Sequence, residues 1–96
     1  MTWTPAHDAA YRVEVERRFR ARTPATTVLD GLPSDRVQRG ELRNWAIEHC
    51  RMLPPETDRA WILAHARWYR RMARRVLLEL DPEALAAYRP WPLPRD

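Results

Sequence analysis

The chain has 96 residues and a formal net charge of +4, which suffices for one domain with a modest core. Its 17 lysine and arginine residues are all arginine, and it has only two glycines, so helices are favoured over a turn-rich all-β fold. The single cysteine, Cys50, excludes an internal disulfide and any site built from several thiolates. No apolar run approaches the roughly 20 residues that span a bilayer. The N-terminus lacks the order of a signal peptide, so we expect a cytoplasmic protein.

The first predicted helix begins at Thr4 and Pro5, a capping residue followed by proline at the first helical position, and runs to about Arg22. Apolar side chains recur every four residues along it, at Tyr11, Val15 and Phe19. Residues 23–34 contain two prolines and an Asp-Gly pair, which indicates a connecting segment.

A second helix is predicted from Glu41 to about Leu53, before Pro54-Pro55 stops it. Ser34-Asp35 can cap a preceding turn of helix that is interrupted or restarted at Gly40. One face of the second helix carries the residues expected to be buried, namely Leu42, Trp45, Ala46, His49 and Leu53.

The longest helix is predicted to start after residues 56–58 and to end near Leu80. Its expected buried side comprises Ile62, Ala66, Tyr69, Ala73, Val76 and Leu80. The opposite arc carries Arg67, Arg70, Arg71, Arg74 and Arg75, with Trp61 and Trp68 at one border. Asp81-Pro82 caps a last short helix through Ala87.

The fold class predicted from these elements is all-α, with three main helices and a short C-terminal one. Residues 1–88 form the helical domain, and residues 89–96, with prolines at 90, 92 and 94, form an extended arm. So short a chain leaves its tryptophan-rich faces incompletely covered, which indicates a partner surface.

The residues alone do not form a catalytic or metal-binding constellation. His49 and Cys50 are adjacent on a helix and point about 100° apart, so we expect no metal site and a core role for Cys50. The arginine face from Arg67 to Arg75 could bind phosphates beside Trp61 and Trp68. A solvated face or an interface to an acidic subunit is the commoner meaning of such a pattern, so nucleic acid is the less favoured partner.

Several motifs in order resemble the N-terminal helical half of a nitrile hydratase β subunit. They are Glu41-Leu42-Arg43, Ala46-Ile47-Glu48, Met52-Leu53-Pro54, Trp68-Tyr69, the run Leu80-Asp81-Pro82-Glu83-Ala84-Leu85, and Pro90-Trp91-Pro92-Leu93. The chain ends where that family's barrel half begins. It is therefore similar to one piece of a split β subunit, as in toyocamycin nitrile hydratase and thiocyanate hydrolase.

The resemblance implies a role in hydrating a small-molecule nitrile to an amide at a cobalt(III) or iron(III) centre. The metal would lie in a partner α subunit, in a claw of oxidised cysteines, and this chain would bind no cofactor. A separate β-barrel-type subunit would be the second partner, contacted by the Pro-rich arm.

The resemblance also implies roles for particular residues. Arg43 matches the family's arginine that hydrogen-bonds the oxidised cysteine oxygens, a task that suits a guanidinium fork. Arg36 or Arg39 takes that role if the insertion lies elsewhere, and a gapless alignment places Asn44 there. Trp68 and Tyr69 lie near the family's aromatic positions that line the substrate pocket; core packing is the alternative for both.

Two other functions stay open at this point. One is a nitrile hydratase activator, a metal-delivery chaperone that resembles the same helical half but does not need the Pro-rich arm. The other is a basic helical regulator that binds nucleic acid through the arginine face.

Overall fold

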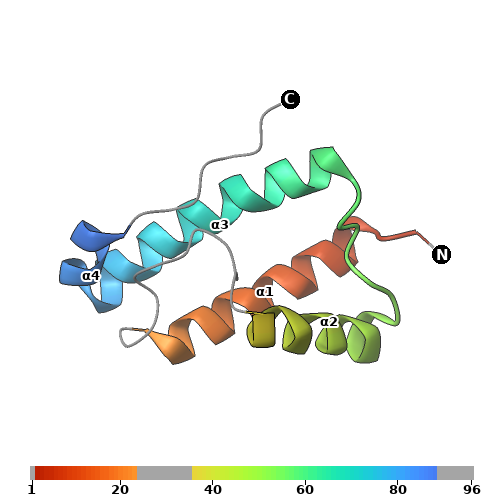
Figure 1. Cartoon of the computed structure of the whole chain (residues 1–96), viewed down its shortest axis with the longest axis horizontal. Coiled ribbons are helices and arrows are strands. Elements are labelled where there is room, and N and C mark those ends of the chain that lie inside the picture. Colours follow the sequence, from red (N-terminus) through yellow and green to blue (C-terminus); the bar gives the residue numbers. More distant parts are fainter. Residues whose placement is uncertain (1, 24–35, 89–96) are drawn as a thin grey trace.

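The computed structural model of the protein describes residues 2–23 and 36–88, so the predicted arm 89–96 and most of the predicted connecting segment lie outside the described residues. The four helices are α1 (Pro5–Arg22), α2 (Arg36–Cys50), α3 (Arg59–Leu80) and α4 (Pro82–Ala87), as Figure 1 shows. The prediction of an all-α fold with three main helices and a short C-terminal one is confirmed.

Helix α1 has the predicted bounds, and its N-terminus is fixed by two reciprocal hydrogen bonds between Thr4 and His7. The Thr4 hydroxyl oxygen accepts the His7 backbone N–H at 3.3 Å, and the Thr4 N–H donates to His7 Nδ1 at 3.1 Å. This reciprocal arrangement is a capping box in which a histidine replaces the usual Glu or Gln. Pro5 then supplies the fixed φ of the first helical position.

Helix α2 differs from its prediction at both ends. It begins at Arg36 and continues through Gly40 without interruption, since one glycine costs a helix only about 1 kcal/mol. It ends at Cys50, because Arg51 adopts a left-handed conformation with φ of 58°. The extension to Leu53 is therefore wrong, and Leu53 is 43% exposed whereas Cys50 is buried. The proposed Ser34-Asp35 cap lies outside the described residues.

Two aspartates set the ends of α3 and α4. Asp58 Oδ1 accepts the backbone N–H groups of Ala60 and Trp61 at 3.0 and 3.2 Å. Asp81 donates its N–H to the Leu77 carbonyl at 2.7 Å, and its Oδ1 accepts the Ala84 N–H at 3.1 Å. The same residue thus closes α3 and opens α4, as the Asp-Pro pair predicted.

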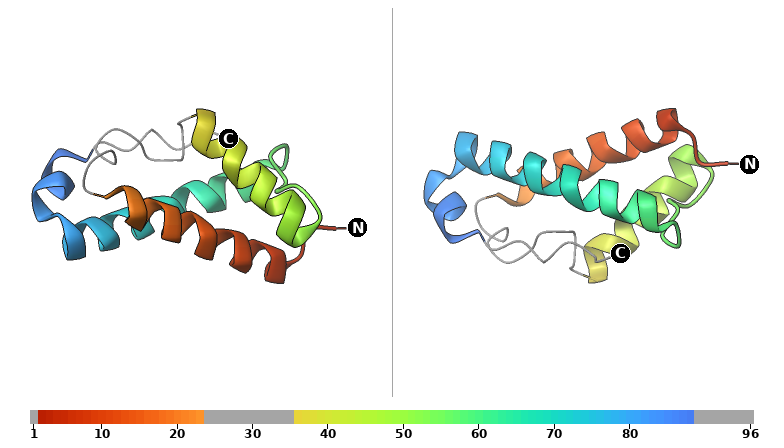
Figure 2. Two further views of the ribbon diagram at one scale, coloured as in Figure 1. Left: turned by 90° about the horizontal axis from the view of Figure 1, so that it is seen from below. Right: turned by 90° about the horizontal axis from the view of Figure 1, so that it is seen from above.

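Helix α1 is the centre of the packing. It contacts α2 along one side and α3 along another, and α4 folds back on α3 (Figures 1 and 2). The backbones of α2 and α3 do not come into contact. The two outer helices therefore depend on α1 to hold them in place.

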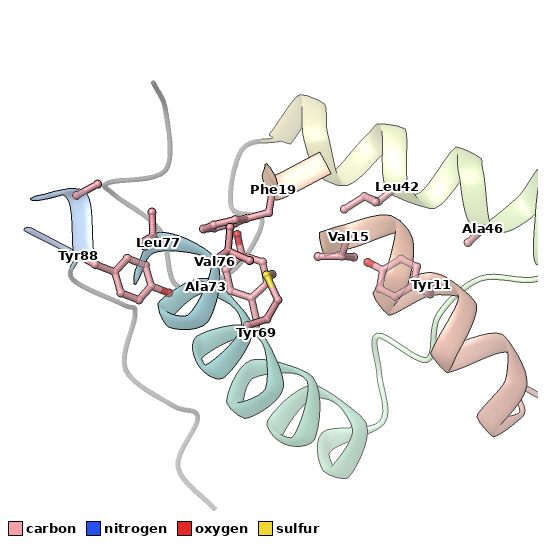
Figure 3. Packing of buried hydrophobic residues seen from close by; sticks show 12 residues of the cluster. Tyr11, Val15, Phe19, Leu42, Ala46, Tyr69, Ala73, Val76, Leu77 and Tyr88 are labelled. Atoms are coloured by element: carbon pink, nitrogen blue, oxygen red, sulfur yellow. The ribbon is translucent and has the colours of Figure 1, made fainter. Parts of the chain in front are cut away.

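The core lies where α1 meets α2 and α3 and where α4 folds back on α3 (Figure 3). Val15, Leu42, Val76 and Leu77 are fully buried there, each worth roughly 1.5–3 kcal/mol of transfer free energy. The predicted face of α3 is correct from Ala66 to Val76, but Leu80 is 47% exposed and Leu77 takes its place. This shift of one turn follows from α4, which folds back onto α3.

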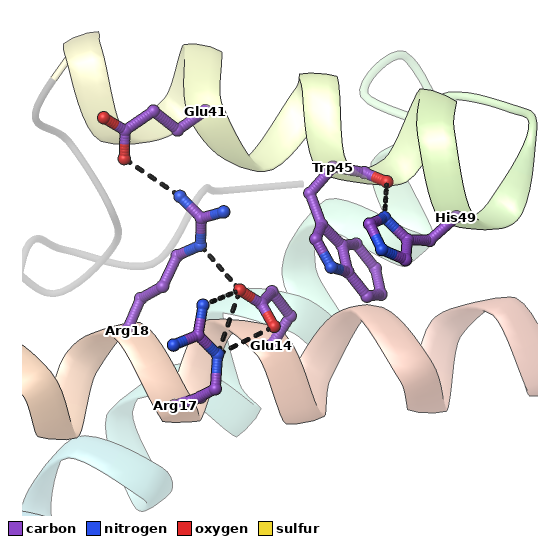
Figure 4. A network of polar contacts seen from close by, with 6 residues as sticks. All are labelled: Glu14, Arg17, Arg18, Glu41, Trp45 and His49. Atoms are coloured by element: carbon purple, nitrogen blue, oxygen red, sulfur yellow. Dashed lines mark hydrogen bonds and ion pairs between the residues drawn. The ribbon is translucent and has the colours of Figure 1, made fainter.

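A buried carboxylate joins α1 to α2. Glu14 is only 7% exposed and accepts hydrogen bonds from Arg17 and Arg18, and Arg18 also donates to Glu41 on α2 at 2.9 Å (Figure 4). The hydrogen bonds from Arg17, and after them those from Arg18, hold the pKa of Glu14 below its ordinary value although burial acts in the other direction.

The predicted burial of His49 is wrong. Its ring is exposed and stacks on the Trp45 ring at 4.8 Å, with Nδ1–H donating to the Trp45 carbonyl at 3.1 Å (Figure 4). Trp45 itself is half-buried against the core. The face of α2 that α1 covers is thus narrower than the sequence indicated.

Candidate functional site

A cleft of about 460 Å³ opens between α2 and α3, and Tyr11 of α1 also lines it. Arg39 and Arg43, one helical turn apart on α2, line it from one side, and Trp61, Ile62 and His65 line it from α3. Because the backbones of α2 and α3 do not approach each other, the space between them is left open at this point. The volume lies in the range of small-molecule sites.

Arg43, the residue expected to brace the partner's oxidised cysteines, is on the rim of this cleft. Its Nη1 donates to Glu56 Oε2 at 3.0 Å, and both side chains are about half exposed. An exposed ion pair of this kind contributes only about 0–1 kcal/mol. The guanidinium of Arg43 can therefore exchange its partner at little cost.

Arg39, one of the alternatives to Arg43, lines the same cleft and is exposed. Within the described part of the chain, no carboxylate pairs with it. Asn44 is exposed as well and is not part of the cleft, and the side chain of Arg36 lies outside the described residues. The structure thus brings together two of the three candidate arginines.

Three aromatic rings line the cleft from α1 and α3: Trp61 and His65 are stacked, and Tyr11 is tilted against both. The Trp61 and His65 rings lie 4.8 Å apart at 26°, and Tyr11 lies 6.2 Å from Trp61 and 5.7 Å from His65. Burial, followed by the nearby charges of Glu56 and Asp8, raises the pKa of Tyr11 to about 12. Its phenol is therefore protonated at any physiological pH and can donate a hydrogen bond.

His65 is the functional candidate that the sequence did not reveal. It is 6% exposed, and its Nε2 is covered without a hydrogen-bond partner among the described residues. Burial, and after it the charge of Arg12, lowers the pKa of His65 to about 4, while Asp8 acts in the opposite direction. The imidazole is thus neutral at pH 7, with a buried polar atom that costs free energy until something pairs with it.

Asp8 fixes the orientation of the aromatic wall. Its Oδ1 accepts the indole N–H of Trp61 at 2.6 Å and that of Trp3 at 3.3 Å. Its Oδ2 lies 2.7 Å from Arg12 Nε, an ion pair in which the N–H is not aimed along the hydrogen-bond direction. The Arg12 guanidinium in turn lies 5.0 Å from the centre of the Trp68 ring.

Trp68 and Tyr69 do not line the cleft that contains Arg43. Tyr69 is 3% exposed and meets Phe19 edge-on at 5.7 Å, within the core. Trp68 is half-buried beneath Arg12. In this structure both residues pack against the core, the alternative that the sequence had left open.

The arginines of the predicted α3 face differ in their surroundings. Arg75 donates to Glu16 of α1 at 2.6 Å, so it belongs to the α1–α3 seam. Arg67, Arg71 and Arg74 are exposed and make no ion pair with another described residue. They lie at spacings of four and three residues, so they form one stripe along α3.

The described residues contain no group of three or more His, Cys, Asp or Glu side chains placed to hold a metal ion. Nor does any helix within those ranges have the length and apolarity to cross a membrane. Cys50 is buried, and burial raises the pKa of its thiol. A buried thiol with a raised pKa is a poor nucleophile, which agrees with a packing role.

Comparison of the chain with models of known protein families, with curated protein sequences and with solved structures finds no match. The resemblance to nitrile hydratase β subunits therefore stays a prediction drawn from the motifs of this chain.

Proposed function

We propose that the protein is a helical subunit of a nitrile hydratase-type enzyme that does not hold the metal itself. The observation that carries the proposal is the position of Arg43: on the rim of an open cleft, half exposed, and held by one weak ion pair. Support also comes from the order of the motifs along the sequence.

In this proposal Arg43 acts on a partner chain. A guanidinium has five N–H donors, and Glu56 accepts from one of them, Nη1. The other donors suit the oxygens of sulfenate or sulfinate groups on an α subunit, which accept hydrogen bonds as anions. The metal of that subunit would supply Lewis-acid activation of the nitrile or of water. This chain would orient the ligands of the metal.

The test is co-expression with the two chains that the proposal requires, a metal-bearing α-type chain and a small barrel-type chain. We expect a stable complex that hydrates nitriles, and we expect Arg43→Lys to lower turnover far more than it weakens assembly, because lysine lacks the planar fork. Arg71→Lys, on the exposed stripe of α3, is the matched control and should leave turnover unchanged. Failure to form a complex, or full turnover in Arg43→Lys, would refute the proposal.

A second candidate function rests on the stripe of Arg67, Arg71 and Arg74. Three exposed guanidinium groups that are not committed to described carboxylates suit a row of phosphates. Three phosphate contacts predict a salt dependence with a logarithmic slope of about −2 to −3 in a filter-binding titration. Lack of binding to single- or double-stranded DNA or RNA at low salt excludes this candidate.

A further inference from the structure

The cleft has the properties of a ligand site that belongs to this chain alone. Its lining comes from three helices of one polypeptide and includes the stacked rings of Trp61 and His65, with the Tyr11 ring tilted against both. Trp61 is locked in place by its 2.6 Å hydrogen bond to Asp8. A rigid aromatic wall of this kind favours a flat, apolar ring as its occupant.

Arg39, on the α2 side of the cleft, favours a negatively charged group on the ligand. Arg39 is exposed, lines the cleft, and pairs with no carboxylate of the described residues. A guanidinium matches the two oxygens of a carboxylate in a bidentate geometry. Glu56, on the same rim, repels a second negative charge and so disfavours a phosphate relative to a singly charged carboxylate.

A third feature is an unpaired polar atom in a residue that lines the cleft. His65 lines the cleft and is 6% exposed, yet its Nε2 has no hydrogen-bond partner among the described residues. Buried polar atoms in folded proteins are almost always paired. Nε2 itself is covered in this structure, so a hydroxyl group on a ligand ring would pair with it only after the His65 ring turns toward the cleft.

From these features we infer that the cleft binds a small planar aromatic carboxylate, with its ring against Trp61 and its carboxylate on Arg39. Arg43 remains with Glu56 in this arrangement. Binding needs no partner subunit, so it does not depend on the function proposed above.

The experiment is a titration of the full chain, labelled with ¹⁵N, with 4-hydroxybenzoate. The indole N–H signal of Trp61 is followed and is assigned by its loss in Trp61→Phe. We expect saturable movement of this signal with a Kd on the order of 1 mM or tighter, as befits a ligand of this size. 4-Hydroxybenzyl alcohol, which lacks the carboxylate, should bind at least about tenfold more weakly.

Arg39→Gln tests the anion contact, and Arg71→Gln is the control that removes the same charge from the exposed stripe of α3. Both residues are on the surface, so both variants should fold. Weakening by about tenfold or more in Arg39→Gln, with unchanged binding in Arg71→Gln, supports the inference. It is overturned if the signal does not saturate, if the two variants weaken binding equally, or if the alcohol binds as well as the acid.

Discussion

The neutral, buried His65 makes a quantitative prediction about acid stability. Its pKa is about 4 in the folded chain, against an ordinary value of 6.5. The unfolded chain therefore binds a proton between these two values while the folded chain does not, and the free energy of unfolding must fall as the pH falls through this window. A pKa difference of this size corresponds to about 3 kcal/mol when the window has been crossed completely.

The measurement should stay above pH 5 to isolate this residue. Hydrogen bonds from Arg17 and Arg75 lower the pKa values of Glu14 and Glu16, respectively, below the ordinary glutamate pKa of 4.5. The stability that these two carboxylates contribute to the fold is therefore fully present above pH 4.5 and is lost only as the pH falls further. Between pH 7.5 and pH 5, His65 alone should lower the free energy of unfolding by about 2 kcal/mol. In a domain of this length, that lowers the melting temperature by on the order of 10 °C.

The assay is urea unfolding followed by circular dichroism at half-unit pH steps. His65→Phe keeps a ring beside Trp61 and Tyr11 but cannot bind a proton, so its stability should be nearly constant across this range. His49→Gln removes an exposed histidine and should keep the wild-type slope, because His65 is still present. A flat wild-type profile, or an unchanged slope in His65→Phe, contradicts the burial of a neutral imidazole.

Three substitutions test the helices themselves. Gly40→Ala should raise the free energy of unfolding by about 0.5–1 kcal/mol, since an added Cβ meets nothing within 4 Å; a loss of stability would show that the helix is strained there. Leu42→Ala should cost about 2–5 kcal/mol, because Leu42 is fully buried against α1, and a cost below 1 kcal/mol in urea titrations would show that the α1–α2 seam is loose. Asp81→Ala removes the N-cap of α4 and should lower the free energy of unfolding by about 1 kcal/mol. Amide hydrogen exchange should also speed up in α4 and stay unchanged in α1. Equal exchange rates of α4 in the wild type and in Asp81→Ala would refute the capping role.

Helix positions could be predicted wherever a local signal was strong. Thr4-Pro5, Asp58 and Asp81-Pro82 each supply a capping oxygen or a fixed φ, and these depend on neighbours in the sequence. The end of α2 could not be found in this way. Nothing in the sequence signals the left-handed conformation of Arg51. The sequence therefore predicts that α2 stops at Pro54-Pro55, whereas the helix ends at Cys50.

The candidate site could be predicted only in part. Arg39 and Arg43 were selected from the sequence, and they do lie on one cleft. His65 was missed because its importance depends on contacts with Tyr11, which is 54 positions away and on another helix. For Trp68 and Tyr69 a motif favours a pocket wall and helical spacing favours core packing, and helical periodicity alone does not distinguish the two.

The separation of α2 from α3 has a mechanical consequence. Among the described residues, helix α2 packs on α1 through Leu42, Ala46 and the bond between Arg18 and Glu41, and its other link is the exposed ion pair from Arg43 to Glu56. A small rotation about the α1–α2 seam would widen or narrow the mouth beside Arg39 while leaving the α1–α3 packing undisturbed. Arg39 and Arg43 are thus carried on a helix that packs on α1 without approaching the α3 backbone, so the way α2 packs on α1 sets the width of the cleft.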